Sequence, residues 1–133
     1  MSEKRVLIPG PDHPITITPN PSRVVVTAGG EVIAETRAAL TLREADYPPV
    51  LYVPRADADL SALERTDHQT YCPYKGDASY YSIRSADGSG ENAVWTYEAP
   101  YDAVAEIKDH LAFYPDRVDS IEEQPVTEVT AGQ

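Results

Sequence analysis

The feature of this sequence that most limits its fold is a run of three valines, followed after two residues by a pair of glycines. Valine is β-branched and favours strands, so residues 24–26 predict a strand. Gly29 and Gly30 can both adopt the positive φ angles of a tight turn, and "EVIAET" returns directly after them. The chain is therefore predicted to contain a β-hairpin at this point.

Further short segments have the composition or the alternation of strands, with prolines or turn residues at their ends. Ile15 and Ile17 alternate with threonines, and Pro54 ends the apolar run "VLYV". Two runs rich in aromatic residues flank "DGSG" at 87–90, which predicts a flexible hairpin loop. The strands predicted beside the first hairpin are residues 15–18, 50–53, 78–85, 92–99 and 117–121.

Two segments have the pattern of short helices. Residues 57–67 hold two leucines three residues apart, and Asp57 is a candidate cap at their start. Residues 101–115 have three apolar side chains on one helical face, with Asp102 as the candidate cap and a proline at the end. We therefore expect helices at both places.

These patterns predict a mainly β (α+β) fold, a compact single domain of antiparallel sheets with one or two short helices. Residues 1–14 contain three prolines and are expected to run extended. Residues 15–121 are expected to form the domain, and residues 122–133 a loosely ordered tail. No run approaches the roughly 18 apolar residues of a membrane span, and no signal-peptide pattern opens the chain. We therefore expect a cytoplasmic protein without a membrane partner.

Charge and cysteine content exclude several functional classes. The chain has 22 acidic and 11 basic residues, a formal net charge of −11, and its basic residues do not cluster. Such a charge disfavours nucleic-acid binding but leaves room for a local basic pocket that holds a small anion. A single cysteine excludes an internal disulfide, and the three histidines lack metal-ligand spacing. We expect no metal site and no cofactor.

The segment "TYCPYKGDASYYSI" carries the most candidate chemistry. Lys75 precedes Gly76 at a turn, so the lysine could reach an anionic group while the backbone approaches it closely. Cys72 could be a thiolate beside Lys75, although burial as an inert thiol is the better-supported reading. Arg55 is a second candidate cation, and Glu98 could pair with either cation or act as a base.

Aromatic residues concentrate around this segment. Six of the nine tyrosines lie within residues 71–101, together with the single tryptophan, Trp95. Since alternate residues of a strand share a face, Trp95 and Tyr97 point the same way, while Tyr80 and Tyr81 point to opposite sides. These side chains either form ordinary sheet core or line a pocket, and the sequence supports both readings equally.

The strings "T-x-C-P-Y-K-G-x-A-x-Y-Y" and "A-V-W-x-Y-x-x-P" resemble the domain-of-unknown-function 427 family, from about Val24 to Val118. The resemblance implies a compact, mostly β domain similar to the β-tent architecture, with small helices at its margins. The paired CxxC motifs with which many β-tent relatives bind zinc do not occur here, so no zinc site is carried over. The residues that the family motif singles out are Arg55, Cys72, Lys75, Gly76, Tyr80, Trp95, Tyr97 and Glu98.

The family is sometimes labelled nucleotidyltransferase-like, and "DAD" at residues 57–59 imitates the paired carboxylates of that chemistry. These acids stand where helix caps are expected, and the glycine-serine element of such enzymes does not accompany them. Capping is therefore the better interpretation, and the family resemblance leaves the activity open.

Two functions compete. In the first, a small anionic molecule binds in an aromatic-lined pocket, where Arg55 and Lys75 hold the anion and Glu98 is a polar anchor or base. If the protein is an enzyme, its candidate catalytic groups are Lys75, Glu98 and Cys72. In the second, the domain is a non-catalytic interaction or scaffold module, for which a homodimer is the simplest partner. The predicted ligand-binding residues are Arg55, Lys75, Gly76, Tyr80, Trp95 and Tyr97.

Overall fold

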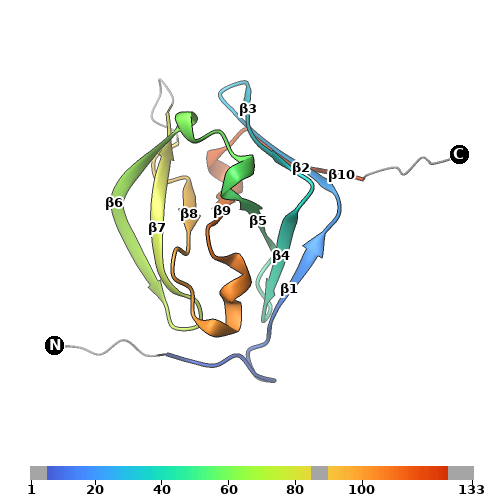
Figure 1. Ribbon diagram of the computed structural model, residues 1–133, viewed down its shortest axis with the longest axis vertical. Coiled ribbons are helices and arrows are strands. Elements are labelled where there is room, and N and C mark those ends of the chain that lie inside the picture. Colours follow the sequence, from blue (N-terminus) through green and yellow to red (C-terminus); the bar gives the residue numbers. More distant parts are fainter. Residues whose placement is uncertain (1–5, 85–89, 126–133) are drawn as a thin grey trace, which may run out of the picture.

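The structure, a computed structural model, describes residues 6–84 and 90–125 (Figure 1). Within these residues it consists of antiparallel strands and short 3₁₀ helices. The strands are β1 (Ile15–Asn20), β2 (Arg23–Ala28), β3 (Glu31–Thr36), β4 (Ala39–Glu44), β5 (Val50–Pro54), β6 (Leu63–Cys72), β7 (Gly76–Ile83), β8 (Val94–Thr96), β9 (His110–Phe113) and β10 (Ser120–Gln124). The 3₁₀ helices are η1 (Arg55–Asp57), η2 (Leu60–Ala62), η3 (Asp102–Ile107) and η4 (Pro115–Arg117).

The described strands form two antiparallel sheets. The larger sheet has seven strands in the order β1-β4-β5-β9-β8-β7-β6, and the smaller has the order β10-β2-β3 (Figure 1). The small sheet joins the predicted hairpin of β2 and β3 to the last strand, which pairs Ile121 with Val26. The predicted mainly β architecture of antiparallel sheets in one compact domain is confirmed.

The main core lies between the two sheets. Val24 and Val26 of β2 are 0% and 1% exposed, and they share this core with Tyr81 and Ile83 of β7. Tyr81 and Ile83 therefore face the small sheet, as the alternation of β7 predicts. Apolar burial of this kind stabilises the folded state by about 25 cal/mol for each Å² removed from water.

A second core lies on the other face of the large sheet. Leu42, Tyr52 and Tyr80 are buried there, and Val104 and Ile107 of η3 pack against them. The large sheet thus buries side chains on both faces, which explains why β7 has few exposed positions. Tyr80 lies in this second core while its neighbour Tyr81 lies in the first, as predicted from the sequence.

The first hairpin forms as predicted. Gly29 and Gly30 have φ angles of 61° and 80°, which is the backbone of a type I′ turn. Strands also form at the positions predicted at 15–18 and 50–53, and β7 forms in the segment predicted at 78–85 but ends at Ile83. In the segment predicted at 92–99 only Val94–Thr96 is a strand, β8, which pairs with β7. The predicted loop at 87–90 falls mainly within residues 85–89, outside the described residues.

The helix predicted over residues 57–67 is wrong. Two single 3₁₀ turns occur there, and the chain from Leu63 onward is the ten-residue strand β6. Asp59, not Asp57, caps η2 by accepting a hydrogen bond from the Ser61 amide at 3.1 Å. Asp57 instead accepts a 2.6 Å hydrogen bond from the Thr36 hydroxyl. Two leucines three residues apart fit a strand end as well as a helix, so the pattern was too short to decide.

The second helix prediction is correct only at its start. Residues 102–107 form the 3₁₀ helix η3, in which the Asp102 side chain makes no cap hydrogen bond. Residues 110–113 form β9, which pairs with both β5 and β8. Leu111 lies opposite Val53 of β5 on one side and Thr96 of β8 on the other. Pairing with these two strands satisfies the backbone hydrogen bonds of β9 and outweighs the helical spacing of its apolar residues.

The structure describes chain segments at both ends of the domain. Residues 6–14 precede β1, and the Leu7 amide donates to the Pro73 carbonyl at 2.9 Å. Residues 122–124, placed in the tail by the sequence, lie in β10, and residues 126–133 lie outside the described residues. No helix among the residues described is long and apolar enough to cross a membrane.

Candidate functional site

Strand β4 separates two pockets. Leu42 and Glu44 of this strand line one of them, and Thr41 and Arg43 line the other. This division follows from the period of a strand, in which successive side chains point to opposite faces. The sequence "TLRE" therefore contributes to two sites at once.

The first of these, which we call the Lys75 pocket, has a volume of about 230 Å³. It lies on the face of the large sheet that carries the second core. Its chief chemical feature is one lysine and one glutamate among many aromatic side chains. It is lined by Leu42, Glu44, Tyr47, Pro48, Val50, Tyr52, Lys75, Tyr80, Trp95, Tyr97 and Tyr114.

Lys75 and Glu44 form a buried ion pair in this pocket. The Lys75 Nζ donates to Glu44 Oε1 at 2.5 Å, and the two side chains are only 10% and 15% exposed. The other Glu44 oxygen lies 2.7 Å from His13 Nε2, and the His13 ring stacks on Tyr74 with centroids 4.0 Å apart. Burial raises the pKa of Glu44, but the hydrogen bonds with Lys75 and His13 outweigh it and hold the pKa below its usual value.

A tight loop between β6 and β7 brings Lys75 to this position. The Lys75 amide donates to the Cys72 carbonyl at 3.1 Å, and the Lys75 carbonyl accepts from the Tyr101 amide at 3.1 Å. Gly76 follows with a φ of 110°, a conformation that side chains rarely adopt. The loop therefore fixes the Lys75 backbone on both sides, and the side chain is directed inward.

Aromatic side chains form the wall of the Lys75 pocket. Trp95 Nε1 donates to the Tyr52 hydroxyl at 3.3 Å, and the rings of the two residues meet edge to face. The centroid of the Trp95 ring also lies 4.6 Å from the centroid of the Tyr114 ring. The Tyr80 hydroxyl is 2.9 Å from Thr70 Oγ1, so Tyr80 has a polar partner outside the pocket.

Several buried donors in the pocket have no acceptor among residues 6–84 and 90–125. The Tyr97 hydroxyl makes no hydrogen bond there, although Tyr97 is only 6% exposed. The Tyr52 hydroxyl accepts from Trp95 and donates to no described residue, and Lys75 uses one of its three donors. Burial, with the nearby Tyr52, raises the pKa of Tyr97 above its usual range, so this hydroxyl keeps its proton. Buried polar groups are nearly always hydrogen-bonded, so such a set requires an explanation.

Of the residues predicted from the sequence, four meet in this pocket: Lys75, Tyr80, Trp95 and Tyr97. Gly76 shapes the loop behind Lys75 without lining the pocket. Cys72 is half-buried and packs against the second core.

Arg55 and Glu98 do not line the Lys75 pocket. Arg55 is exposed in η1. Glu98 accepts two hydrogen bonds from the Arg65 guanidinium, at 3.0 and 3.1 Å. Glu98 lies in a bend after β8, where its carboxylate is held by Arg65 and not by a residue of the pocket.

Sequence reasoning missed several important residues of the pocket. Glu44 stands two residues after Leu42 in the alternating run "LTLRE". This alternation is the only signal in the sequence that could have placed Glu44 on the same strand face as Leu42. Tyr52 lies in the correctly predicted strand "VLYV", but its partner across the sheet depends on register. His13 lies 31 residues from Glu44, so no local pattern indicates this contact.

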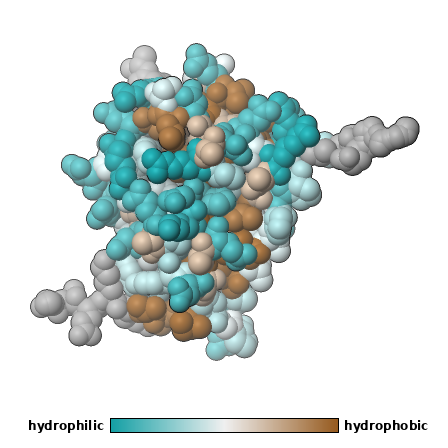
Figure 2. Space-filling model, in the orientation of Figure 1, coloured by the Kyte–Doolittle hydropathy of each residue, from teal (hydrophilic) through white to brown (hydrophobic). Residues whose placement is uncertain are grey.

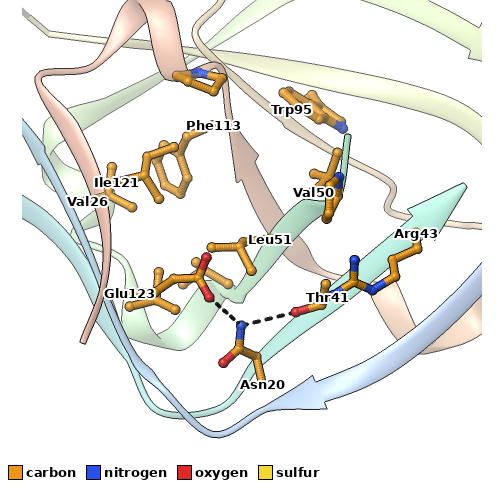
Figure 3. A pocket seen from close by; sticks show the side chains of 14 residues that line it. Asn20, Val26, Thr41, Arg43, Val50, Leu51, Trp95, Phe113, Ile121 and Glu123 are labelled. Carbon is orange, nitrogen blue, oxygen red and sulfur yellow. Dashed lines mark hydrogen bonds between the residues drawn. The ribbon is translucent and has the colours of Figure 1, made fainter. Parts of the chain in front are cut away.

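The second pocket, which we call the inter-sheet pocket, opens between the two sheets and has a volume of about 430 Å³ (Figure 3). Its walls are mostly apolar, and its polar residues gather at one edge (Figure 3). Trp95 and Val50 line both pockets. The residues of the inter-sheet pocket are Asn20, Val24, Val26, Thr41, Arg43, Pro49, Val50, Leu51, Val53, Trp95, Phe113, Pro115, Ile121 and Glu123.

The residues that the structure describes contain no group of three or more histidine, cysteine, aspartate or glutamate side chains that could hold a metal ion. A model of the family described as "Domain of unknown function (DUF427)" matches residues 16–124. No curated protein matches the chain.

Proposed function

Since the chain belongs to the DUF427 family, whose description assigns no activity, we propose a function from the site itself: the Lys75 pocket binds a small anionic ligand, best matched by a carboxylate. The observation that carries this proposal is the set of buried donors that lack acceptors among the described residues, made by the Tyr52 and Tyr97 hydroxyls and the two remaining donors of Lys75. A carboxylate has two oxygens that accept such hydrogen bonds. Hydrogen bonds to a charged group are also stronger than those between neutral groups.

The charge of the pocket also supports an anion. Glu44 and Lys75 neutralise one another, so the pocket is not acidic despite its carboxylate. Both Glu44 oxygens already accept hydrogen bonds, which leaves Lys75 as the charged group with donors to spare.

Size and shape favour a small ligand. Typical pockets for drug-sized molecules occupy roughly 300–1,000 Å³, and the Lys75 pocket falls below this range at about 230 Å³. The aromatic walls can pack against an apolar or planar body attached to the carboxylate. We therefore infer a ligand of the size of acetate, lactate or benzoate.

Binding is better supported than catalysis through Lys75. A nucleophilic lysine needs its nitrogen directed at the substrate, whereas the Lys75 Nζ donates to Glu44 Oε1 at 2.5 Å. The remaining Lys75 donors can still orient an anion. This is the role that we assign to it.

The rival reading as an interaction domain has less support. Tyr52, Tyr80 and Tyr97 are 1%, 5% and 6% exposed, so these aromatics are in the interior and cannot form an interface centre. Figure 2 shows one face of the molecule covered mostly by hydrophilic side chains, with the hydrophobic ones in separate patches. A stable protein interface has an apolar core of larger extent.

Calorimetry and thermal unfolding with sodium acetate, sodium benzoate and inorganic phosphate test the proposal. A ligand at one hundred times its dissociation constant stabilises the native state by about 2.7 kcal/mol. We expect at least one carboxylate to stabilise the protein, and the Lys75→Met variant to lose this effect. Lys108→Met is the matched control, because Lys108 is exposed and does not line the pocket. Equal stabilisation of the native protein and the Lys75→Met variant would refute the proposal, as would no binding by any of the three anions.

A further inference from the structure

The inter-sheet pocket has a chemistry that differs from that of the Lys75 pocket. We propose that it is a second binding site, and that it takes a small zwitterion with an apolar side group, of the class of an apolar amino acid. This proposal does not depend on the function of the Lys75 pocket, because β4 and β5 separate the two sites.

The body of the inter-sheet pocket suits an apolar side group. Both sheets contribute to it, with Val26 and Ile121 from the small sheet and Leu51 and Phe113 from the large one (Figure 3). Val53 of β5 also lines it. Its volume of about 430 Å³ lies within the range of roughly 300–1,000 Å³ that is typical of ligand sites. An apolar group that enters it would be removed from water where these side chains surround it.

The polar edge of the pocket is organised by Asn20. Its side-chain amide donates to Thr41 Oγ1 at 3.1 Å and to Glu123 Oε1 at 3.0 Å, as Figure 3 shows. These contacts link β1, β4 and β10, so they fix the edge where the two sheets come together. Thr41 is only 7% exposed and is held in place by this network.

Two opposite charges line the same edge without neutralising one another. Arg43 and Glu123 lie on opposite sides of the Asn20–Thr41 pair in Figure 3. Among the described residues Arg43 makes no ion pair or side-chain hydrogen bond, and Glu123 accepts only from Asn20. Arg23 and Arg65, in contrast, pair with Glu35 and Glu98.

This arrangement matches the two charges of an amino acid. The Arg43 guanidinium can donate two parallel hydrogen bonds to a carboxylate, and the free oxygen of Glu123 can accept from an ammonium group. A simple carboxylate would bring a second negative charge close to Glu123. A simple amine would bring a second positive charge close to Arg43. A zwitterion with an apolar side group matches both charges and the walls.

Trp95 provides a signal for this site in the Lys75→Met variant, in which the Lys75 pocket that Trp95 also lines should no longer bind carboxylates. It is the single tryptophan of the chain and lines the inter-sheet pocket. Its fluorescence, excited where tyrosine absorbs little, can be followed during titration with three matched compounds. These are L-leucine, isocaproate, which lacks the ammonium group, and isopentylamine, which lacks the carboxylate. Calorimetry of the same titrations detects binding that leaves the fluorescence unchanged.

We expect leucine to bind at least about tenfold more tightly than either analogue, the effect of losing one charged hydrogen-bonding group. Arg43→Gln should lower leucine affinity by a similar factor, and so should Glu123→Gln, which keeps an acceptor for Asn20. Glu122→Gln is the matched control, because Glu122 is exposed on the same strand and does not line the pocket.

The Lys75→Met variant separates the two proposals, since it should lose carboxylate binding in its own pocket and keep leucine binding here. Three results would overturn the zwitterion site. They are the lack of leucine binding by both methods, equal affinities for leucine and either analogue, and equal losses of affinity in Glu122→Gln and Glu123→Gln. Thermal unfolding of each variant verifies that the fold is retained.

Discussion

Arg43 and Glu44 are adjacent in the sequence, yet they line different pockets on opposite faces of β4. Glu44 is half-buried and paired with Lys75, whereas Arg43 is exposed and has no charged partner among the residues described. One strand thus supplies a neutralised charge to one site and an available charge to the other. Variants of either residue can therefore be used to test each pocket separately.

The ion pair between Lys75 and Glu44 should contribute to stability. In Lys75→Met the Glu44 carboxylate loses its charged partner and keeps only His13, so we expect the free energy of unfolding to fall by roughly 2–3 kcal/mol. Urea denaturation of the native protein and the variant measures this change.

A double-mutant cycle checks the cause. Lys75→Met combined with Glu44→Leu leaves no unpaired charge, so its loss of stability should be smaller than the sum of the two single losses. Additive losses would show that the pair is not coupled and that Lys75 acts through packing alone.

The stability contributed by Glu44 should depend on pH. The hydrogen bonds with Lys75 and His13 hold its folded-state pKa below the ordinary value of 4.5, so the native state favours the ionised form. This contribution is complete above the unfolded-state pKa and is lost as the pH falls through the lower, folded-state pKa. The difference in unfolding free energy between the native protein and Glu44→Gln should therefore shrink as the pH is lowered from about 6 to about 3.

Urea denaturation at a series of pH values and constant ionic strength measures that difference. Other carboxylates titrate in both proteins and cancel. A difference that stays constant down to about pH 3, or that grows, contradicts the lowered pKa of Glu44.

The Tyr97 and Tyr80 hydroxyls should respond differently to removal. Tyr97 has no hydrogen-bond partner among the described residues, so Tyr97→Phe should leave the free energy of unfolding unchanged within about 0.5 kcal/mol, or raise it. Tyr80 lies 2.9 Å from Thr70 Oγ1, so Tyr80→Phe should cost about 1 kcal/mol. Carboxylate binding should weaken in Tyr97→Phe despite its intact stability. A loss of stability in Tyr97→Phe as large as that in Tyr80→Phe would show that a partner holds the Tyr97 hydroxyl.

Local patterns were sufficient for much of the fold. The hairpin of β2 and β3 follows from its valines and from Gly29-Gly30, and the opposite directions of Tyr80 and Tyr81 follow from alternation. Strand β9 could not be predicted this way, because its apolar residues also fit a helix and its identity depends on pairing with β5 and β8.

The site was less predictable than the fold. Lys75, Tyr80, Trp95 and Tyr97 were identified, because they share one motif-rich stretch of the sequence. The partner of Lys75 is 31 residues away on β4, and only the strand order of the large sheet brings the two together. Such a pairing depends on register, which a single sequence does not specify.

Gly76 offers the last test, because its backbone positions Lys75. Its φ of 110° is strained for any residue with a side chain, and a Cβ atom placed on it would lie 3.5 Å from the Ala99 carbonyl oxygen, at ordinary contact distance. The cost of Gly76→Ala should therefore come from the backbone conformation, at roughly 1–3 kcal/mol of unfolding free energy.

Gly10→Ala is the matched control. Gly10 has no positive φ, and a Cβ atom there would meet nothing within 4 Å, so this substitution should be neutral or slightly stabilising. If Gly76→Ala folds and shifts the loop, carboxylate affinity should fall together with stability, while leucine binding in the inter-sheet pocket should persist. Equal stability of the two alanine variants would show that the loop relaxes freely, and the positioning of Lys75 would then have to come from its pair with Glu44 alone.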